Sequence, residues 1–224
     1  MSVEAMTALG RLIADRSRAK MLEVLMSGTA LTAGELARVA GIAPSTASEH
    51  LAQLVDGGLV VDERHGRNRY FRIAGADIAS LLEASLTAAE PPTDRRVPHD
   101  LRYARTCYDH LAGELGVSIF DSLLRDDHLI LEDGIPRLTP GGHDHLARLE
   151  IDPSSVSGHR RQPARLCLDW THRRYHLGGA IAARMLDRML TDGWFVRRRT
   201  PRALRLTSRG EAKLVEHFGL QLGR

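Results

Sequence analysis

The chain has 224 residues, of which 43% are hydrophobic and 26% are charged, enough to bury one large core or two small ones. No apolar run reaches the length that crosses a bilayer, and the N-terminus lacks the basic and apolar segments of a signal peptide. We therefore expect a cytoplasmic protein with no membrane partner. Two cysteines cannot form a disulfide framework, which excludes the disulfide-rich secreted class.

The formal net charge of +3 is unevenly distributed along the chain. Residues 1–90 hold 9 Lys and Arg against 11 Asp and Glu, whereas residues 91–224 hold 22 against 17. This balance permits nucleic-acid binding without requiring it. If the first part binds DNA, it must use locally clustered cations.

Three helices are predicted before residue 42. Apolar residues recur at helical spacing in the first: Met6, Leu9, Leu12 and Ile13. The second, "SRAKMLEVLMSG", ends at Gly28. In the third, "LTAGELARVAGI", Thr32 can cap the N-terminus, Glu35 occupies the capping-box position and Gly41 ends the helix.

The stretch "APSTASEHLAQLVDGGLVV" (43–61) predicts a fourth helix with two different ends. Its N-terminal end carries short hydroxyl side chains, and its C-terminal end is apolar. The following "LVVDERHGRNRYFRI" alternates apolar and polar residues around His65 and Gly66, which is typical of a β-hairpin. A last helical pattern, "DIASLLEASLTAA", follows.

This order of elements predicts a winged helix-turn-helix, whose second helix enters the major groove N-terminus first. Short hydroxyls let that helix approach the base edges, while arginines of the hairpin reach phosphates or the minor groove. The alternative is a capped surface helix beside a charged hairpin, because helical corners also occur in ordinary bundles. The expected DNA-binding residues are Pro44, Ser45, Thr46, Ser48, Glu49, His50, Gln53, Arg64, Arg67, Asn68 and Arg69.

Over about residues 5–90 the sequence closely resembles the ArsR family of bacterial winged-helix repressors. The pattern S-x-H-L-x-x-L-x-x-x-G-L-V is matched by Ser48, His50, Leu51, Leu54, Gly58, Leu59 and Val60. The wing pattern G-R-x-x-Y is matched by Gly66, Arg67 and Tyr70. The resemblance implies a homodimer, paired through the first and last helices of the domain, that binds an inverted repeat in double-stranded DNA and is released by an effector.

The metal sites of the resembled family are missing from this part of the chain. "GELARVAG" has no cysteine, and "ADIASLLEASLTAAE" offers Asp77, Glu83 and Glu90 without a histidine. Carboxylates alone are poor ligands for zinc or nickel. No obligatory cofactor is evident from the sequence, and the effector is left open between a metal, an oxidant and a small organic molecule.

A proline-rich segment, "AAEPPTDRRVPHD" (88–100), predicts a linker. The expected domains are a DNA-binding and dimerisation domain (1–88), a linker (89–100) and a sensory domain (101–224).

The second domain contains an internal repeat. "HLAGELGVSIFDSLLRDDHLI" (110–130) aligns with "HLGGAIAARMLDRMLTDGWFV" (176–196), and "RLTPGGHDHL" (137–146) aligns with "RLTSRGEAKL" (205–214). Each copy, about residues 101–150 and 165–224, is predicted as helix, helix, hairpin, helix, which is a winged-helix outline. The predicted fold is thus mainly α with small β-hairpins: an N-terminal winged helix-turn-helix and two winged-helix-like repeats. Some larger ArsR-like regulators have a C-terminal half with similar segments.

Candidate ligand residues lie near the start of each repeat. On a helix, Cys107 and His110 would share one side, and on a strand Cys167 and Asp169 would share one face. A pocket where the repeats meet could therefore hold two thiols, two imidazoles and a carboxylate. The alternative is that these side chains pack in the core. The candidate set is Cys107, His110, Cys167, Asp169, Trp170 and His176.

The last hairpin, "FVRRRTPRALRLTSRG", is rich in arginine. No helix with a hydroxylated front precedes it. We therefore favour a solvated face, or one paired with acidic groups, over a second DNA contact.

The sequence predicts a DNA-binding transcriptional regulator, a repressor, modulated by an effector at its second domain. One alternative is a chromosome-binding protein without an effector. A weaker one is a Cys/His/Asp enzyme fused to a DNA-binding domain. No nucleophile elbow, phosphate loop or His-Glu-x-x-His motif is present, so we expect no catalytic residue.

Overall fold

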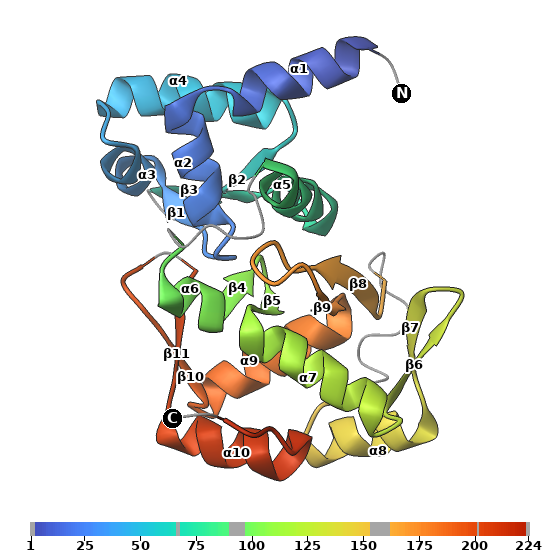
Figure 1. The fold of residues 1–224 in the computed structure, drawn as a ribbon. Helices are drawn as coiled ribbons and strands as arrows, with labels where there is room; N and C mark the ends of the chain where they lie inside the picture. The colour runs from blue at the N-terminus through green and yellow to red at the C-terminus, as the bar shows by residue number, and fades with distance from the viewer. Residues whose placement is uncertain (1–2, 66–67, 90–96, 153–161, 201, 223–224) are drawn as a thin grey trace. The chain divides into compact units, whose positions relative to one another are not determined.

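The computed structural model describes residues 3–65, 68–89, 97–152, 162–200 and 202–222 (Figure 1). The chain divides into two compact units, residues 1–81 and 82–224. Within the described residues, none of the helices combines the length and the apolar character needed to span a membrane.

The first unit contains the predicted helices and hairpin. Its elements are α1 (Val3–Ile13), α2 (Arg16–Leu25), β1 (Leu31–Thr32), α3 (Ala33–Ala40), α4 (Pro44–Asp56), β2 (Val60–His65), β3 (Asn68–Ile73) and the first residues of α5 (Ala76–Ala89). The strands form one antiparallel sheet in the order β1-β3-β2. The predicted winged helix-turn-helix order is therefore confirmed.

Helix α3 begins and ends where its sequence indicates. The Thr32 hydroxyl accepts a hydrogen bond from the Glu35 backbone N–H, and the Glu35 carboxylate accepts one from the Thr32 N–H, so the predicted capping box is present. Gly41 ends the helix in the left-handed region with a φ of 72°. The apolar side of α4 is buried at Leu51 and Leu54, which holds the helix against the rest of the unit.

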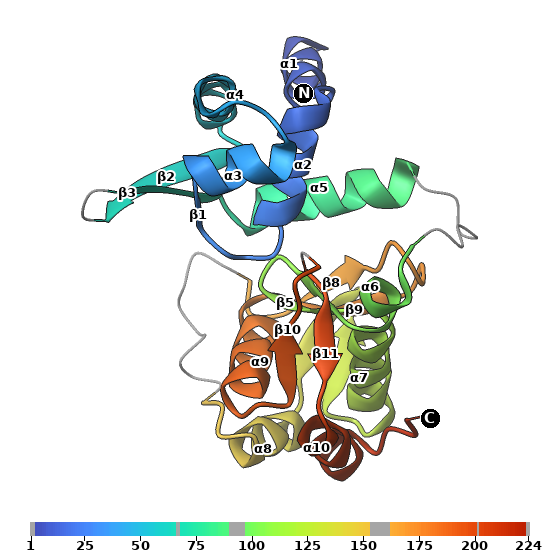
Figure 2. The ribbon, with the colours of Figure 1, turned by 90° about the vertical axis from the view of Figure 1, so that its left-hand side faces the viewer.

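The β2–β3 hairpin runs in register from Val60 opposite Ile73 to His65 opposite Asn68. Its base is buried at Val60, Phe71 and Ile73, whereas its tip is exposed. Figure 2 shows the hairpin extending away from the helices of its unit, as a wing does.

The second unit consists of short hairpins and helices in alternation. Its elements after α5 are α6 (His99–Tyr103), β4 (Arg105–Cys107), β5 (His110–Ala112), α7 (Glu114–Arg125), β6 (Leu129–Glu132), β7 (Ile135–Leu138), α8 (Pro140–Arg148), β8 (Arg165–Leu168), β9 (Tyr175–Gly178), α9 (Ala180–Thr191), β10 (Phe195–Arg197), β11 (Leu204–Leu206) and α10 (Ser208–Phe218).

The same order of elements, hairpin, helix, hairpin, helix, occurs in both halves of this unit. In the first half the short helix α6 precedes this series. The prediction of helix, helix, hairpin, helix is therefore wrong directly before α7 and α9, where a hairpin stands in each half. The segments around Cys107 and Cys167 form the β4–β5 and β8–β9 hairpins. In the first half only two residues, Tyr108 and Asp109, separate the strands, so the chain turns back before a helix can begin.

Local details recur at corresponding places of the two halves. Gly113 and Gly179 precede α7 and α9 with φ values of 83° and 99°, a conformation that favours glycine. Thr139 and Thr207 cap α8 and α10, each accepting from the N–H three residues later at 3.0 Å. The helices of both halves thus begin with the same local features.

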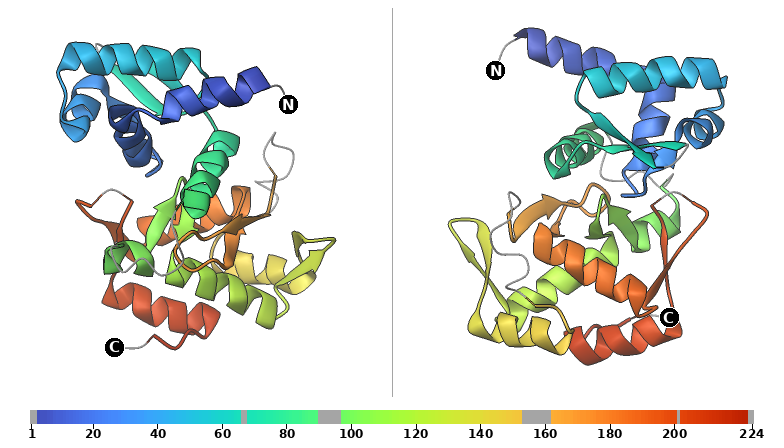
Figure 3. Two further views of the ribbon diagram at one scale, coloured as in Figure 1. Left: turned by 45° about the horizontal axis from the view of Figure 1, so that its top comes forward. Right: turned by 180° about the vertical axis from the view of Figure 1, so that it is seen from behind.

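The two halves share one hydrophobic core. Helix α7 packs against β9 of the other half, and α9 packs against β5. The buried side chains of these two helices include Leu115, Ile119, Leu123, Ile181, Met185 and Met189. Helices α8 and α10 lie next to one another at the end of the unit away from the β4–β5 and β8–β9 hairpins (Figures 1 and 3).

The predicted domain boundary, after residue 88, falls at the C-terminal end of α5. This helix crosses from the first unit into the second, since the division lies between Leu81 and Leu82. Residues 90–96 of the predicted linker lie outside the described residues. The boundary at residue 88 stays a prediction.

Candidate functional site

The N-terminal end of α4 presents short polar side chains. Pro44, Ser45 and Ser48 are exposed, and Thr46 is half-buried. Ala43 supplies no side-chain cap, so the first backbone N–H groups of α4 have no capping side chain. Free N–H groups at a helix N-terminus attract anions such as phosphate. The exposed surface of α4 therefore combines anion-seeking amides with hydroxyls.

Arg18 of α2 holds two of the predicted DNA-binding side chains. Its guanidinium donates to the Gln53 side-chain oxygen at 2.6 Å and lies 3.2 Å from His50 Nδ1. The same guanidinium is anchored by the backbone oxygens of Leu12, at 2.7 Å, and Arg11, at 2.8 Å. His50 and Gln53 are thus fixed on one side of α4. This role cannot be predicted from the sequence, because nothing in the spacing connects Arg18 to residues more than 30 positions away.

The hydroxyl of Ser48 donates to the Pro44 carbonyl oxygen at 2.9 Å. Its lone pairs, but not its proton, remain available to a partner. Glu49 is exposed on the same helix.

Cations gather near the tip of the wing. Arg64 lies opposite Arg69 across the hairpin, and both are exposed, as is Asn68. Arg69 donates to Asp62 at 2.6 Å, and this hydrogen bond holds the pKa of the Asp62 carboxyl below its usual range. Arg67 and Gly66 lie outside the described residues.

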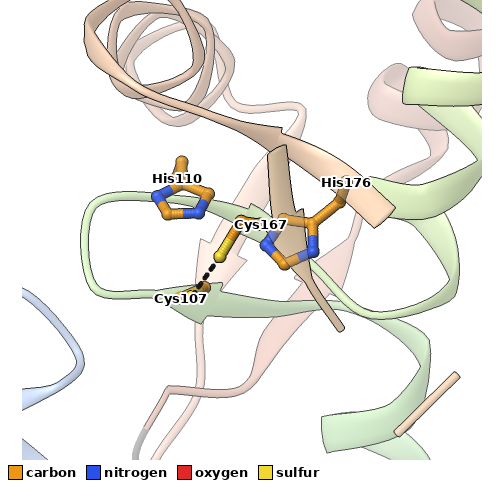
Figure 4. Close-up of side chains that lie close together, drawn as sticks. All are labelled: Cys107, His110, Cys167 and His176. Carbon is orange, nitrogen blue, oxygen red and sulfur yellow. Dashed lines mark hydrogen bonds between the residues drawn. The ribbon is translucent and has the colours of Figure 1, made fainter. Parts of the chain in front are cut away.

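The second unit brings four of the predicted ligand residues together in a buried cluster, which we call the Cys–His cluster: Cys107, His110, Cys167 and His176. Figure 4 shows both imidazole rings directed toward the two sulfurs. One candidate ligand atom from each residue lies within 4.8 Å of the others, and the sulfurs are 3.7 Å apart. His110 and His176 have no exposed surface, and the cysteines are 2% and 5% exposed.

The cluster is built by cross-strand pairs and not by a helix. Cys107 of β4 lies opposite His110 of β5, and Cys167 of β8 lies opposite His176 of β9. The expectation that Cys107 and His110 share a helix is therefore wrong, because β4 and β5 form a tight hairpin. Each half of the unit nevertheless supplies one thiol and one imidazole.

The two thiols share a hydrogen bond, which affects their acidity in opposite directions. This hydrogen bond and burial together raise the pKa of Cys107 to about 12. The same bond lowers the pKa of Cys167, against the effect of burial. Cys167 is thus the more acidic of the two thiols. The thiolate is the form of cysteine that binds metals.

Asp169 lies beside the cluster in a network of buried charges. Its carboxylate accepts hydrogen bonds from Arg105 at 2.9 Å and from the Gly113 N–H at 2.7 Å. Arg105 has no exposed surface, and its guanidinium lies over the Trp170 ring at 4.9 Å. Asp169 and Trp170, the other two predicted ligand residues, thus contact Arg105.

Glu83 of α5 completes this network. Arg202 donates to the Glu83 carboxylate at 2.6 Å, and Arg105 lies 3.5 Å from its other oxygen. Burial alone would raise the pKa of Glu83, but Arg202 and Arg105 outweigh it and lower that pKa. One arginine of the arginine-rich last hairpin is therefore buried in an ion pair.

Comparison with known proteins places the chain among transcriptional regulators. Residues 13–63 match a family model described as a helix-turn-helix domain. The HTH-type transcriptional regulator YdfF of Bacillus subtilis is 38% identical over 96% of this chain and 97% of its own length. The HTH-type transcriptional regulator CmtR of Mycobacterium tuberculosis is 35% identical over 37% of this chain and 69% of its own.

A solved structure from Mycobacterium bovis, titled a homodimeric winged helix-turn-helix DNA-binding domain, is 30% identical. It covers 43% of this chain and 85% of its own, with a TM-score of 0.37.

We predict that Glu83→Gln lowers the free energy of unfolding of the second unit by about 3 kcal/mol at pH 7, since it removes the charge that neutralises two buried arginines. Urea unfolding followed by tryptophan fluorescence reports this unit, because the two tryptophans of the chain, Trp170 and Trp194, lie in it. The lowered pKa of Glu83 means that its carboxylate stabilises the fold above the unfolded pKa of about 4 and loses this effect as pH falls. The difference between wild type and variant should therefore narrow toward pH 3.

The control is Glu132→Gln, whose carboxylate is more than half exposed in the same unit. It should change stability little. Equal stability of Glu83→Gln and wild type at pH 7 would contradict the role of this ion pair.

Proposed function

Because the chain belongs to the ArsR-type helix-turn-helix transcriptional regulators, which bind DNA, we propose that it is a homodimeric repressor of an inverted-repeat operator. It acts in the cytoplasm, on the nucleoid. An effector bound to the second unit modulates its affinity for the operator.

The exposed polar end of α4 beside a cationic wing carries this proposal. Helix α4 enters the major groove with Ser45, Thr46 and Ser48 leading, and its uncapped amides reach a phosphate. Arg64, Arg67 and Asn68 of the wing contact the backbone or the minor groove. Pro44, Glu49 and Arg69 line the same surface.

Arg18 serves as a positioning residue in this interface. By holding Gln53 and His50 in fixed orientations, it limits the rotamers from which they contact DNA. A side chain that is already ordered loses less entropy on binding.

The dimer contact is assigned to α1 and α5. Helix α1 buries none of its residues within one chain and exposes Val3 (78%) and Met6 (63%). Leu81 of α5 is 39% exposed. A second copy of the same helices would cover these apolar side chains, and a two-fold dimer matches the two-fold symmetry of an inverted repeat.

The effector site is assigned to the second unit, at Cys107, His110, Cys167, Asp169, Trp170 and His176. Its support is the convergence of two thiols and two imidazoles in one buried place. A chromosome-binding protein without an effector would not need this cluster. An enzymatic role has less support, since the four side chains are buried and the family consists of transcriptional regulators.

We predict that the full chain is a dimer at micromolar concentration by light scattering. It should protect two half-sites about one helical turn apart, or a small multiple of that distance. Met6→Glu should give monomers, because it places a charge in the proposed contact, whereas Val39→Glu, at an exposed apolar residue of α3, should leave the dimer intact. A monomeric wild type or an asymmetric footprint would contradict the dimer.

We further predict different effects from the helix and from the wing. Ser48→Ala should reduce discrimination between operator and random DNA by about tenfold, as expected for a base contact. Arg67→Ala should weaken binding to both and lower the slope of log affinity against log salt by about one. The control Arg72→Ala removes an exposed arginine at the base of the same hairpin. An unchanged salt slope in Arg67→Ala would mean that the wing does not contact phosphates.

A further inference from the structure

The Cys–His cluster has the composition and size of a tetrahedral metal site. In a tetrahedral zinc site the Zn–S bonds of 2.3 Å place two sulfurs about 3.8 Å apart. The Cys107 and Cys167 sulfurs are 3.7 Å apart. The widest separation among the four candidate ligand atoms is 4.8 Å, so small side-chain rotations suffice to bring all four to one ion.

Both imidazoles have nitrogens with no hydrogen-bond partner. Among the described residues, no acceptor or donor reaches His110 Nε2 or His176 Nε2. Each side chain is fully buried, and leaving a buried polar atom unpaired is unfavourable. A metal ion at the centre of the cluster would supply the missing partner for both.

The other nitrogen of each ring faces a carboxylate. His110 Nδ1 lies 3.2 Å from an Asp109 oxygen, and His176 Nδ1 lies 3.9 Å from an Asp169 oxygen. Only the His110 contact is within hydrogen-bond distance, and His176 Nδ1 has no hydrogen-bond partner among the described residues. A carboxylate that accepts from Nδ1 commonly orients a metal-binding histidine and leaves its Nε2 free, so Asp109 can orient His110 in this way. Both carboxylates belong to a Cys-x-Asp sequence, at residues 107–109 and 167–169.

We propose that the Cys–His cluster binds one Zn²⁺ ion per chain, with Cys107, His110, Cys167 and His176 as its ligands. Two sulfurs and two nitrogens in a tetrahedron suit zinc among the common divalent ions. On binding, each thiol, and any imidazole that carries a second proton, releases that proton to solvent. Two thiolates with two neutral imidazoles then balance the charge of the ion. The site is then neutral, as its burial requires.

The ion joins the two halves of the second unit. Each hairpin contributes one cysteine and one histidine, so zinc links β4–β5 to β8–β9 without a covalent bond between them. This inference identifies Zn²⁺ as the ligand of the proposed effector site. Only the role of zinc as an effector rests on the proposed function. Zinc binding itself is measured without DNA, so either claim can fail while the other stands.

The test uses the full chain, purified with a reductant, stripped of metal by a chelator and titrated with Zn²⁺ or Co²⁺. We expect one ion per chain by elemental analysis, and a Co²⁺ spectrum with tetrahedral d–d bands and a sulfur-to-cobalt charge-transfer band. Cys107→Ser/Cys167→Ser should lose that band and the bound ion. His110→Ala/His176→Ala should weaken zinc binding at least tenfold, and His143→Ala, at an exposed histidine of α8, should not.

Asp109→Asn provides a variant that leaves all four ligands in place. It should weaken zinc binding about ten- to a hundredfold, as loss of an orienting carboxylate does. Wild type without bound zinc and without the charge-transfer band would overturn the proposal. This spectrum of the wild type decides the matter even if a variant fails to fold.

Discussion

Arg105 carries its charge on a side chain with no exposed surface, and the second unit is organised around the groups that neutralise it. An unpaired buried charge would cost several kcal/mol, so Asp169 and Glu83 must stay within reach. Asp169 follows β8, Glu83 lies on α5 and Arg105 begins β4, which means that one guanidinium fixes three separate segments. The Trp170 ring covers its face.

The same network connects the Cys–His cluster to α5. Asp169 lies between the two, 2.9 Å from Arg105 and 3.9 Å from His176 Nδ1, and Arg105 in turn lies 3.5 Å from Glu83. A metal ion bound to His176 would change the electrostatic potential at Asp169. It would thereby change the strength of the ion pair between Asp169 and Arg105. This line of charges lies within the second unit, where it runs from His176 to Glu83 of α5.

The first unit could be predicted closely because its signals are local. The capping box of Thr32 and Glu35 and the apolar alternation of the wing each act within a few residues. In the second unit the sequence indicates that two thiols and two imidazoles could meet, with packing in the core as the alternative, and the structure brings them together. The helix expected at Cys107 is wrong, because a two-residue turn leaves little local signal. The partners of Arg18 and Arg105 lie far away in sequence, and only the tertiary fold reveals them.

We propose that the second unit controls operator binding through its Cys–His cluster. The most direct test of this proposal is the operator affinity of the full chain at fixed salt, with and without one equivalent of Zn²⁺, for wild type and Cys107→Ser/Cys167→Ser. The account predicts that zinc weakens operator binding by wild type about tenfold, which corresponds to about 1.4 kcal/mol of coupling, and leaves the double variant unchanged. An equal affinity of wild type with and without bound zinc would contradict it.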